Sequence, residues 1–136
     1  MFYNNMHIKL RNGDGVMKEL EKNNQSFEDI KHIDENDIEY WYARELMIIL
    51  EYKQWRRFES VIEKAKESCE NSDISVIEHF ANVGKTIKMP KGAEKIIPDY
   101  KLTRYACYLI AQNGDSRKKV ISLAQLILQF KRENKN

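Results

Sequence analysis

Basic side chains cluster in the second half of the sequence at a spacing that suits contact with a polyanion. Six of them fall within residues 85–104, opposed only by Glu94 and Asp99: Lys85, Lys88, Lys91, Lys95, Lys101 and Arg104. On a β-hairpin, such lysines could share one face and follow a phosphate backbone. Lysine on an edge strand also prevents aggregation, and this alternative fits the pattern equally well.

A second basic cluster, Arg117-Lys118-Lys119, follows the turn formers Asn113 to Ser116. If a helix begins at Asp115 or Ser116, three cations lie in its first turn, each unfavourable there by about 0.3–1 kcal/mol. A bound phosphate would reverse that penalty, because first-turn N–H groups and basic side chains would then converge on one anion. The alternative is an exposed turn whose charges are screened by solvent. The two clusters together predict the nucleic-acid-binding residues Lys85, Lys88, Lys91, Lys95, Arg104, Arg117, Lys118 and Lys119.

The net charge of +2 conceals a division between the two halves of the chain. Residues 1–80 hold 11 Lys and Arg against 17 Asp and Glu, a net −6, whereas residues 81–136 hold 12 against 4, a net +8. Such asymmetry indicates binding to nucleic acid or another polyanion. A solvated surface without a ligand, or attraction between the two halves, would leave the same pattern.

Other chemistries find little support in the sequence. It holds no glycine-rich phosphate loop, no H-E-x-x-H and no G-x-S-x-G motif. Cys69 and Cys107 stand far apart and the three histidines are scattered, so neither a zinc site nor a disulfide is expected. We therefore expect no enzyme, no cofactor and no metal.

The length and hydropathy of the chain predict one intracellular domain. No apolar run approaches the ~18 residues that span a bilayer, and the first residues lack the pattern of a secretory signal. We expect a cytoplasmic protein without membrane contact. The predicted division is an N-terminal extension over 1–25, a domain over 26–133 and a tail over 134–136.

The elements that must position the basic clusters are helices and short hairpins, so the predicted fold class is α+β. Asn113-Gly114 is expected to end one helix in a left-handed turn. The expected elements of the first half are a short helix over Val16–Lys22, a β-hairpin on either side of Asp34–Asp37, a helix over Ala43–Tyr52 and, after a break near Tyr52-Lys53, a second helix that runs to about Asn71. A short helix around Ile74–Asn82, with Asp73 as a possible N-cap, is expected next. The rest is a hairpin or lysine-rich loop with strands Lys85–Lys88 and Lys95–Tyr100, followed by helices over Leu102–Asn113 and from Arg117 into Lys131-Arg132.

Two of these features permit a second interpretation. The helices before and after the break near Tyr52-Lys53 could form a helix-turn-helix, with Lys53, Gln54, Arg56 and Arg57 at the start of the second helix. An ordinary helical hairpin is favoured, because the later surface of that helix is acidic and would repel phosphate. Trp41, Tyr105 and Tyr108 could stack on bases, although burial in the core is the favoured role of such aromatics.

Several long segments resemble the DNA damage-inducible protein D family. They are WYARELMIILEYKQWRRFESVIEKAKESCENS, EHF at Glu78–Phe80, KGAEKIIPDYKLTRYACYLIAQNGDSRK and Ala124-Gln125, which occur in the family's order and spacing over roughly residues 27–125. The run LTRYACYLIAQNGD at Leu102–Asp115 is the most distinctive. The sequence departs from the family at Glu51, where Gly is usual before Tyr, and at Ser116, where Pro is common. The family's second, largely helical region is absent.

The resemblance implies a Bro-N domain, which is a DNA-binding module, and a role in the bacterial DNA damage (SOS) response. The expected partner is DNA, single- or double-stranded, and the resemblance also suggests a RecA-type recombinase filament. The alternative function is a protein-interaction module that acts on that filament without touching DNA. The acidic first 80 residues suit such a basic partner.

Overall fold

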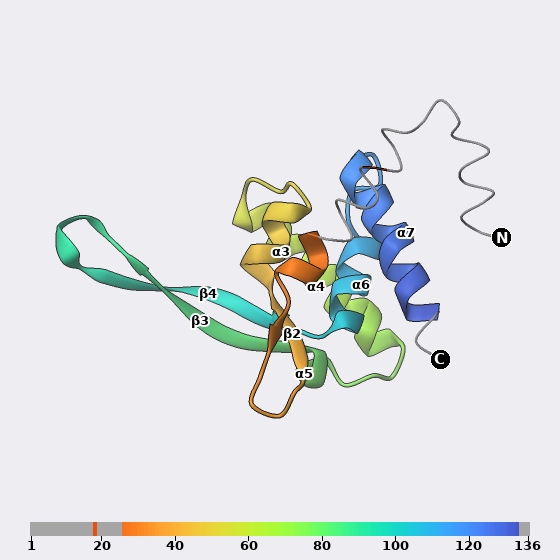
Figure 1. The fold of residues 1–136 in the computed structure, drawn as a ribbon, viewed down its shortest axis with the longest axis horizontal. Coiled ribbons are helices and arrows are strands. Elements are labelled where there is room, and N and C mark those ends of the chain that lie inside the picture. Colours follow the sequence, from red (N-terminus) through yellow and green to blue (C-terminus); the bar gives the residue numbers. More distant parts are fainter. Residues whose placement is uncertain (1–17, 19–25, 134–136) are drawn as a thin grey trace.

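A four-stranded antiparallel sheet lies against a group of helices in the computed structural model, which describes residue 18 and residues 26–133 (Figure 1). The strand order is β1-β2-β4-β3. One face of the sheet carries Trp41, Phe80, Tyr100 and Leu102, all buried in the core. The predicted α+β class is confirmed. The helix expected over Val16–Lys22 lies outside the described residues, apart from Lys18.

The first hairpin pairs β1 (His32–Ile33) with β2 (Glu39–Tyr42), as predicted. Its turn is held by Asp34, whose carboxylate accepts hydrogen bonds from the backbone N–H groups of residues 36 and 38. The expected first strand is shorter than predicted, because residues 26–29 are helical. This helical turn stacks the Phe27 ring on the Trp41 ring, with the ring centres 4.4 Å apart. The backbone carbonyl of Phe27 accepts a hydrogen bond of 2.8 Å from Trp41 Nε1. Burial of this aromatic pair outweighs the local strand preference.

The helical hairpin of α3 (Ala43–Ile49) and α4 (Trp55–Asn71) is confirmed. The α4 side chains that recur at helical spacing, Phe58, Ile62, Ala65 and Cys69, are all fully buried. Helix α3 ends in a Schellman motif, in which the N–H groups of Glu51 and Tyr52 donate to the carbonyls of Ile48 and Met47. Glu51 occupies the left-handed position of that motif, at φ 61°.

The expected short helix is shorter than predicted, and its N-cap is wrong. Helix α5 covers only Val76–His79, and the next residues already belong to β3. Asp73 adopts φ 59° and donates its N–H to the carbonyl of Glu70, while Ile74 N–H reaches that of Cys69. Asp73 therefore occupies the left-handed position that ends α4, a role which the short polar side chain of Asp tolerates.

The lysine-rich segment, predicted as a hairpin or a loop, forms a hairpin whose strands are longer than expected. Strand β3 (Phe80–Lys88) pairs with β4 (Glu94–Leu102) over nine residues, and the turn η1 (Pro90–Gly92) joins them. The carbonyl of Pro98 accepts a hydrogen bond from Arg44 Nε and therefore points away from β3. The backbone nitrogen of Pro98 points the same way, so the pairing of β4 with β3 does not need the N–H that proline lacks. Opposite Pro98 stands Gly84, where a Cβ would come 2.7 Å from Ile96 Cγ2.

The expected helix over Leu102–Asn113 is α6 (Arg104–Gln112), capped by Thr103, whose hydroxyl accepts from Ala106 N–H. The left-handed stop predicted at Gly114 is wrong, because Gly92 is the glycine with positive φ among the described residues. Asp115 N–H donates to the Tyr52 hydroxyl at 3.1 Å instead of closing a Schellman motif. Glycine favours this close packing, since a Cβ would lie only 3.0 Å from Ile121 Cδ1 and 3.2 Å from the Tyr52 hydroxyl, and these side chains would have to shift.

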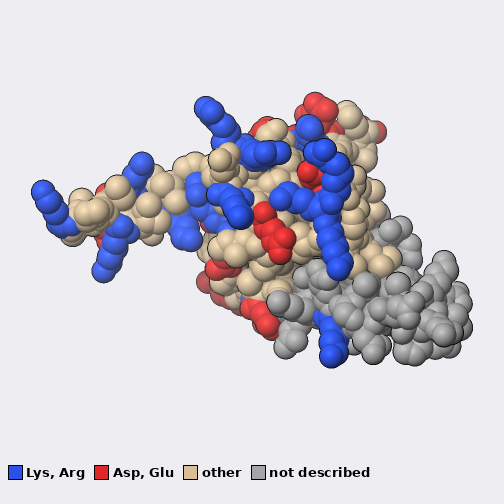
Figure 2. All heavy atoms as spheres, turned by 90° about the horizontal axis from the view of Figure 1, so that it is seen from above, with Lys and Arg blue, Asp and Glu red and all other residues tan. Residues whose placement is uncertain are grey.

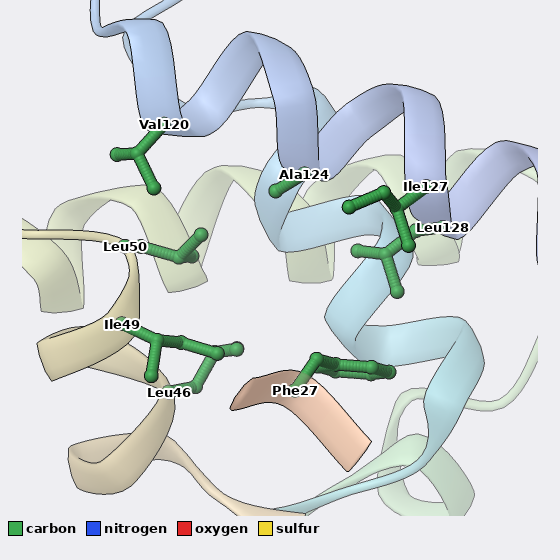
Figure 3. Close-up of a pocket in the computed structure, with 8 residues that line it drawn as sticks. All are labelled: Phe27, Leu46, Ile49, Leu50, Val120, Ala124, Ile127 and Leu128. Carbon is green, nitrogen blue, oxygen red and sulfur yellow. The ribbon is translucent and has the colours of Figure 1, made fainter. Parts of the chain in front are cut away.

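The last helix, α7 (Lys119–Glu133), packs across α6 and over Phe27 and α3. Figure 3 shows an apolar hollow between them, lined by Phe27, Leu46, Ile49, Leu50, Val120, Ala124, Ile127 and Leu128. Such a lining offers no polar group for chemistry, so this hollow belongs to the core. None of the described helices combines the length and apolar character that a membrane span requires.

Candidate nucleic-acid interface

The outer part of the β3–β4 hairpin projects from the body (Figure 1). We name residues 84–98 the arm. Directly opposed residues of an antiparallel pair share a face of the sheet. Lys85 lies opposite Ile97, and Lys95 opposite Ile87, so these two lysines share one face; Lys88, opposite Glu94, occupies the other. The expectation that the lysines share a single face is therefore only partly met, and the arm carries cations on both sides.

The base of the arm is anchored to the start of α3. The buried carboxylate of Asp99 accepts hydrogen bonds from the N–H groups of Arg44 at 3.0 Å and Tyr100 at 2.8 Å. The Arg44 side chain donates to the Pro98 carbonyl at 2.7 Å and lies over the Trp55 ring at 4.1 Å. An acidic residue at a helix N-terminus is favourable, so Asp99 stabilises α3. The same hydrogen bond ties strand β4 to the start of this helix at the base of the arm.

The Arg104 side chain forms ion pairs within the body of the protein. Its guanidinium donates two hydrogen bonds to Glu39, at 2.8 and 3.0 Å, and one to Glu28 at 3.1 Å. Its side chain is only 16 % exposed. These carboxylates raise the pKa of Arg104 against the opposing effect of burial. The ion pairs join the first hairpin to α6, so we leave Arg104 out of the proposed interface.

The Arg117–Lys119 cluster does not fill a helical first turn. The expectation that its helix begins at Asp115 or Ser116 is wrong, since α7 begins at Lys119. Asp115 instead forms a turn by accepting from the Arg117 N–H and side chain, and this pairing lowers the pKa of Asp115. Lys118 Nζ donates to the Glu51 carbonyl at 3.3 Å and lies over the Tyr52 ring.

The arrangement expected at α7, with exposed cations in the first turn of a helix, is found at the start of α4. Arg56 and Arg57, both exposed, lie in its first turn, which contains no acidic residue. Two cations near the positive end of a helix dipole favour a bound anion. Because Lys118 contacts residues 51 and 52, the cluster at 117–119 lies beside this helix start. We name the combined surface the body patch: Lys53, Arg56, Arg57, Arg117 and Lys118.

Basic side chains lie along the arm and over part of the body on the face that Figure 2 shows. The N-terminal end of α7 lies on the upper side of Figure 1, from which Figure 2 is seen. Figure 2 shows Lys and Arg side chains along the projecting hairpin and over the body beyond its base, with acidic side chains interspersed on the body. The sequence alone places Lys53, Arg56 and Arg57 in a possible helix-turn-helix. It could not show that the fold brings residues 117 and 118 to the same place.

The aromatic residues considered for base stacking are differently placed. Trp41 is fully buried and hydrogen-bonded, so that interpretation of Trp41 is wrong. The outer sheet face instead carries Tyr40, Tyr42 and His32, whose rings contact one another, with Lys101 Nζ 4.4 Å from the Tyr40 ring centre. Their neighbours already cover much of these rings, so we do not assign them to base stacking.

The cysteines lie in the core. Cys69 and Cys107 are both free and buried, and burial raises the pKa of each thiol, that of Cys107 strongly. A thiol held protonated is a poor nucleophile and a poor metal ligand. Among the side chains that the structure describes, no group of three or more His, Cys, Asp and Glu residues is arranged to hold a metal ion.

Residues 29–129 match the BRO family, N-terminal domain, and the chain belongs to this family. A curated relative is DNA damage-inducible protein D of Escherichia coli (strain K12), which is 42% identical over 106 residues. The match covers 78% of this chain and 39% of the relative, so the chain spans about two fifths of that protein's length. No solved structure matches significantly. The family match lies within the predicted domain 26–133, while the limits of the extension and the tail stay predictions.

Proposed function

We propose that this chain is a non-catalytic DNA-binding domain that contacts phosphates through the arm and the body patch. The observation that carries the proposal is the projecting arm with lysines on both faces and at its tip. Residues 85–95 contain four lysines and one glutamate, a net charge of +3.

The geometry of the arm favours insertion into a groove over lying flat on a surface. A two-stranded ribbon can lie in the major or the minor groove of B-form DNA, and phosphates bound each groove on both sides. Cations on both faces of the ribbon can then meet both phosphate rows, Lys85 and Lys95 on one side and Lys88 on the other. If the lysines only prevented aggregation at the exposed edge strand, fewer charges would suffice and the hairpin would not need to project from the body.

The relatives support a nucleic-acid context. The name of the Escherichia coli relative refers to DNA damage, and we propose that this chain acts in a bacterial damage response, inside the cell. The alternative is a protein-interaction module for a RecA-type recombinase filament. It is favoured by the exposed acidic turn of the first hairpin, where Glu35 and Asp37 face solvent. Filament capture that disappears on nuclease treatment would eliminate this alternative.

A pair of single substitutions tests the arm directly. Lys85 lies on the arm, whereas Lys64 is exposed on α4, and each substitution by Ala removes one positive charge. The logarithm of duplex affinity falls by about 0.9 per phosphate contact for each tenfold rise in salt concentration. Between 1 M and 0.1 M salt, one contact therefore contributes about eightfold in affinity. Lys85→Ala should therefore weaken duplex binding by about eightfold at 0.1 M salt, whereas Lys64→Ala should change it by less than about twofold. Fluorescence anisotropy of a labelled duplex measures both, and equal losses would contradict a specific role for the arm.

A further inference from the structure

The tip of the arm is a closed, preorganised turn. Met89 N–H donates to the Ala93 carbonyl at 2.7 Å, directly beyond the last strand pair, Lys88 and Glu94. Between them, Lys91 at φ 69° and Gly92 at φ 83° both adopt left-handed backbone, and Pro90 has its φ fixed by its ring. The turn therefore presents its side chains in one defined arrangement.

This basic tip also exposes apolar side chains. Met89 is 39 % exposed and Ile96, on the adjoining strand, is 72 % exposed, while Pro90 also faces solvent. Exposed apolar area is unfavourable in water by about 25 cal/mol per Å². A partner that offers phosphates to the lysines and an apolar surface to the tip is duplex DNA, whose stacked bases lie between its phosphate rows.

The arm is long enough to reach those bases. Its last described hydrogen bond to the body is at Pro98, opposite Gly84. The strands continue for the four residues Lys85–Lys88 on one side and Glu94–Ile97 on the other. Four residues extend about 13 Å at roughly 3.3 Å each, before the turn is counted. The grooves of B-form DNA are only about 7.5–8.5 Å deep, so the tip reaches the base edges while the lysines remain level with the phosphates.

We propose that the tip inserts Met89, supported by Pro90, between adjacent base pairs and bends the duplex. In proteins that bind the minor groove, Met and Pro are among the side chains that form such wedges, and a wedge kinks DNA by partly unstacking one base step. The preferred ligand is then a duplex with an easily opened step, such as T-A, C-A or a mismatch. This inference rests on the proposed DNA binding and specifies its ligand.

The test compares the wild type with Met89→Ala and with Ile77→Ala, a matched control because Ile77 is an exposed apolar residue on α5. The probes are two duplexes of equal length, one fully paired and one with a central mismatch beside 2-aminopurine, each carrying a donor and an acceptor dye at its ends. The wild type and Ile77→Ala should bind the mismatched duplex about tenfold more tightly, bend it and increase 2-aminopurine fluorescence. Met89→Ala should still bind, with a preference below about twofold and without either signal.

The outcomes separate this inference from the proposed function. Wild-type binding without bending, or bending that Met89→Ala retains, would overturn insertion of the tip and leave DNA binding intact. A wild-type protein that binds neither duplex at low salt would overturn the proposed function itself. Because Met89 lies on the surface of the arm, its substitution should preserve the fold, which circular dichroism verifies.

Discussion

Glu51 occupies a backbone position that suits glycine, and Glu51→Gly should stabilise the protein. This residue follows the C-cap of α3 at φ 61°, and its N–H donates to the Ile48 carbonyl at 3.0 Å. The neighbouring bond from Tyr52 N–H to the Met47 carbonyl completes the Schellman motif. Gly is the usual residue at this position, because a Cβ strains left-handed backbone.

The expected gain is the difference between two opposing effects. Left-handed backbone costs an L-residue about 1–2 kcal/mol. Glycine loses about 0.5–1 kcal/mol more conformational entropy on folding than alanine. The net stabilisation should be about 0.5–1 kcal/mol, which raises Tm by roughly 2–5 °C for a domain of this size. The Lys118 contact survives the substitution, because it is made to the backbone carbonyl of residue 51.

Glu51→Ala is the matched control. It removes the same side chain and charge but keeps a Cβ, so the left-handed strain remains. Urea unfolding of the three proteins should place Glu51→Gly above both the wild type and Glu51→Ala. A Gly variant no more stable than the Ala variant would refute the assignment of strain to this position.

Three further predictions concern the core. Arg104→Met removes the guanidinium that pairs with Glu28 and Glu39 and leaves them only the longer ion pairs with Lys31, at 3.4 and 3.9 Å. It should lower the free energy of unfolding by about 2–3 kcal/mol in urea titrations. Full stability with lost DNA binding would instead make Arg104 a DNA contact. Gly114→Val places side-chain atoms against Ile121 and should cost about 2 kcal/mol in the same assay, whereas wild-type stability would contradict the close packing there. Burial raises the pKa of the Cys107 thiol well above its usual range, so a disulfide reagent at pH 8 should modify it only after denaturant is added. Rapid modification of the native protein would contradict this burial.

Regular elements could be predicted from the sequence because their signals are local. The helical spacing of Phe58, Ile62, Ala65 and Cys69 predicted α4 and its end near Asn71. Turn formers between β-prone runs predicted both hairpins. Asp73 was misassigned, because the same side chain suits the start of one helix and the end of another. Which role it takes depends on backbone hydrogen bonds that composition does not show.

The candidate site depended on contacts between distant parts of the chain. Arg104 was grouped with the arm lysines as a neighbour in sequence, but its carboxylate partners stand 65 and 76 residues away. Lys118 reaches Glu51 across 67 residues, and so extends the surface that begins at Arg56 and Arg57. Charge clustering therefore predicted where cations are abundant, while the fold decides which of them reach solvent together.

The central claim is that the arm lysines contact DNA phosphates, and the salt dependence of duplex affinity tests it most directly. The variant replaces Lys85, Lys88, Lys91 and Lys95 with Ala, and its control replaces the same four with Arg. If all four contact phosphates, the slope of log K against log salt should become shallower by about 3.6 in the Ala variant, at about 0.9 per contact, and stay unchanged in the Arg variant. An Ala variant that retains the wild-type slope would contradict the claim and remove the arm from the interface.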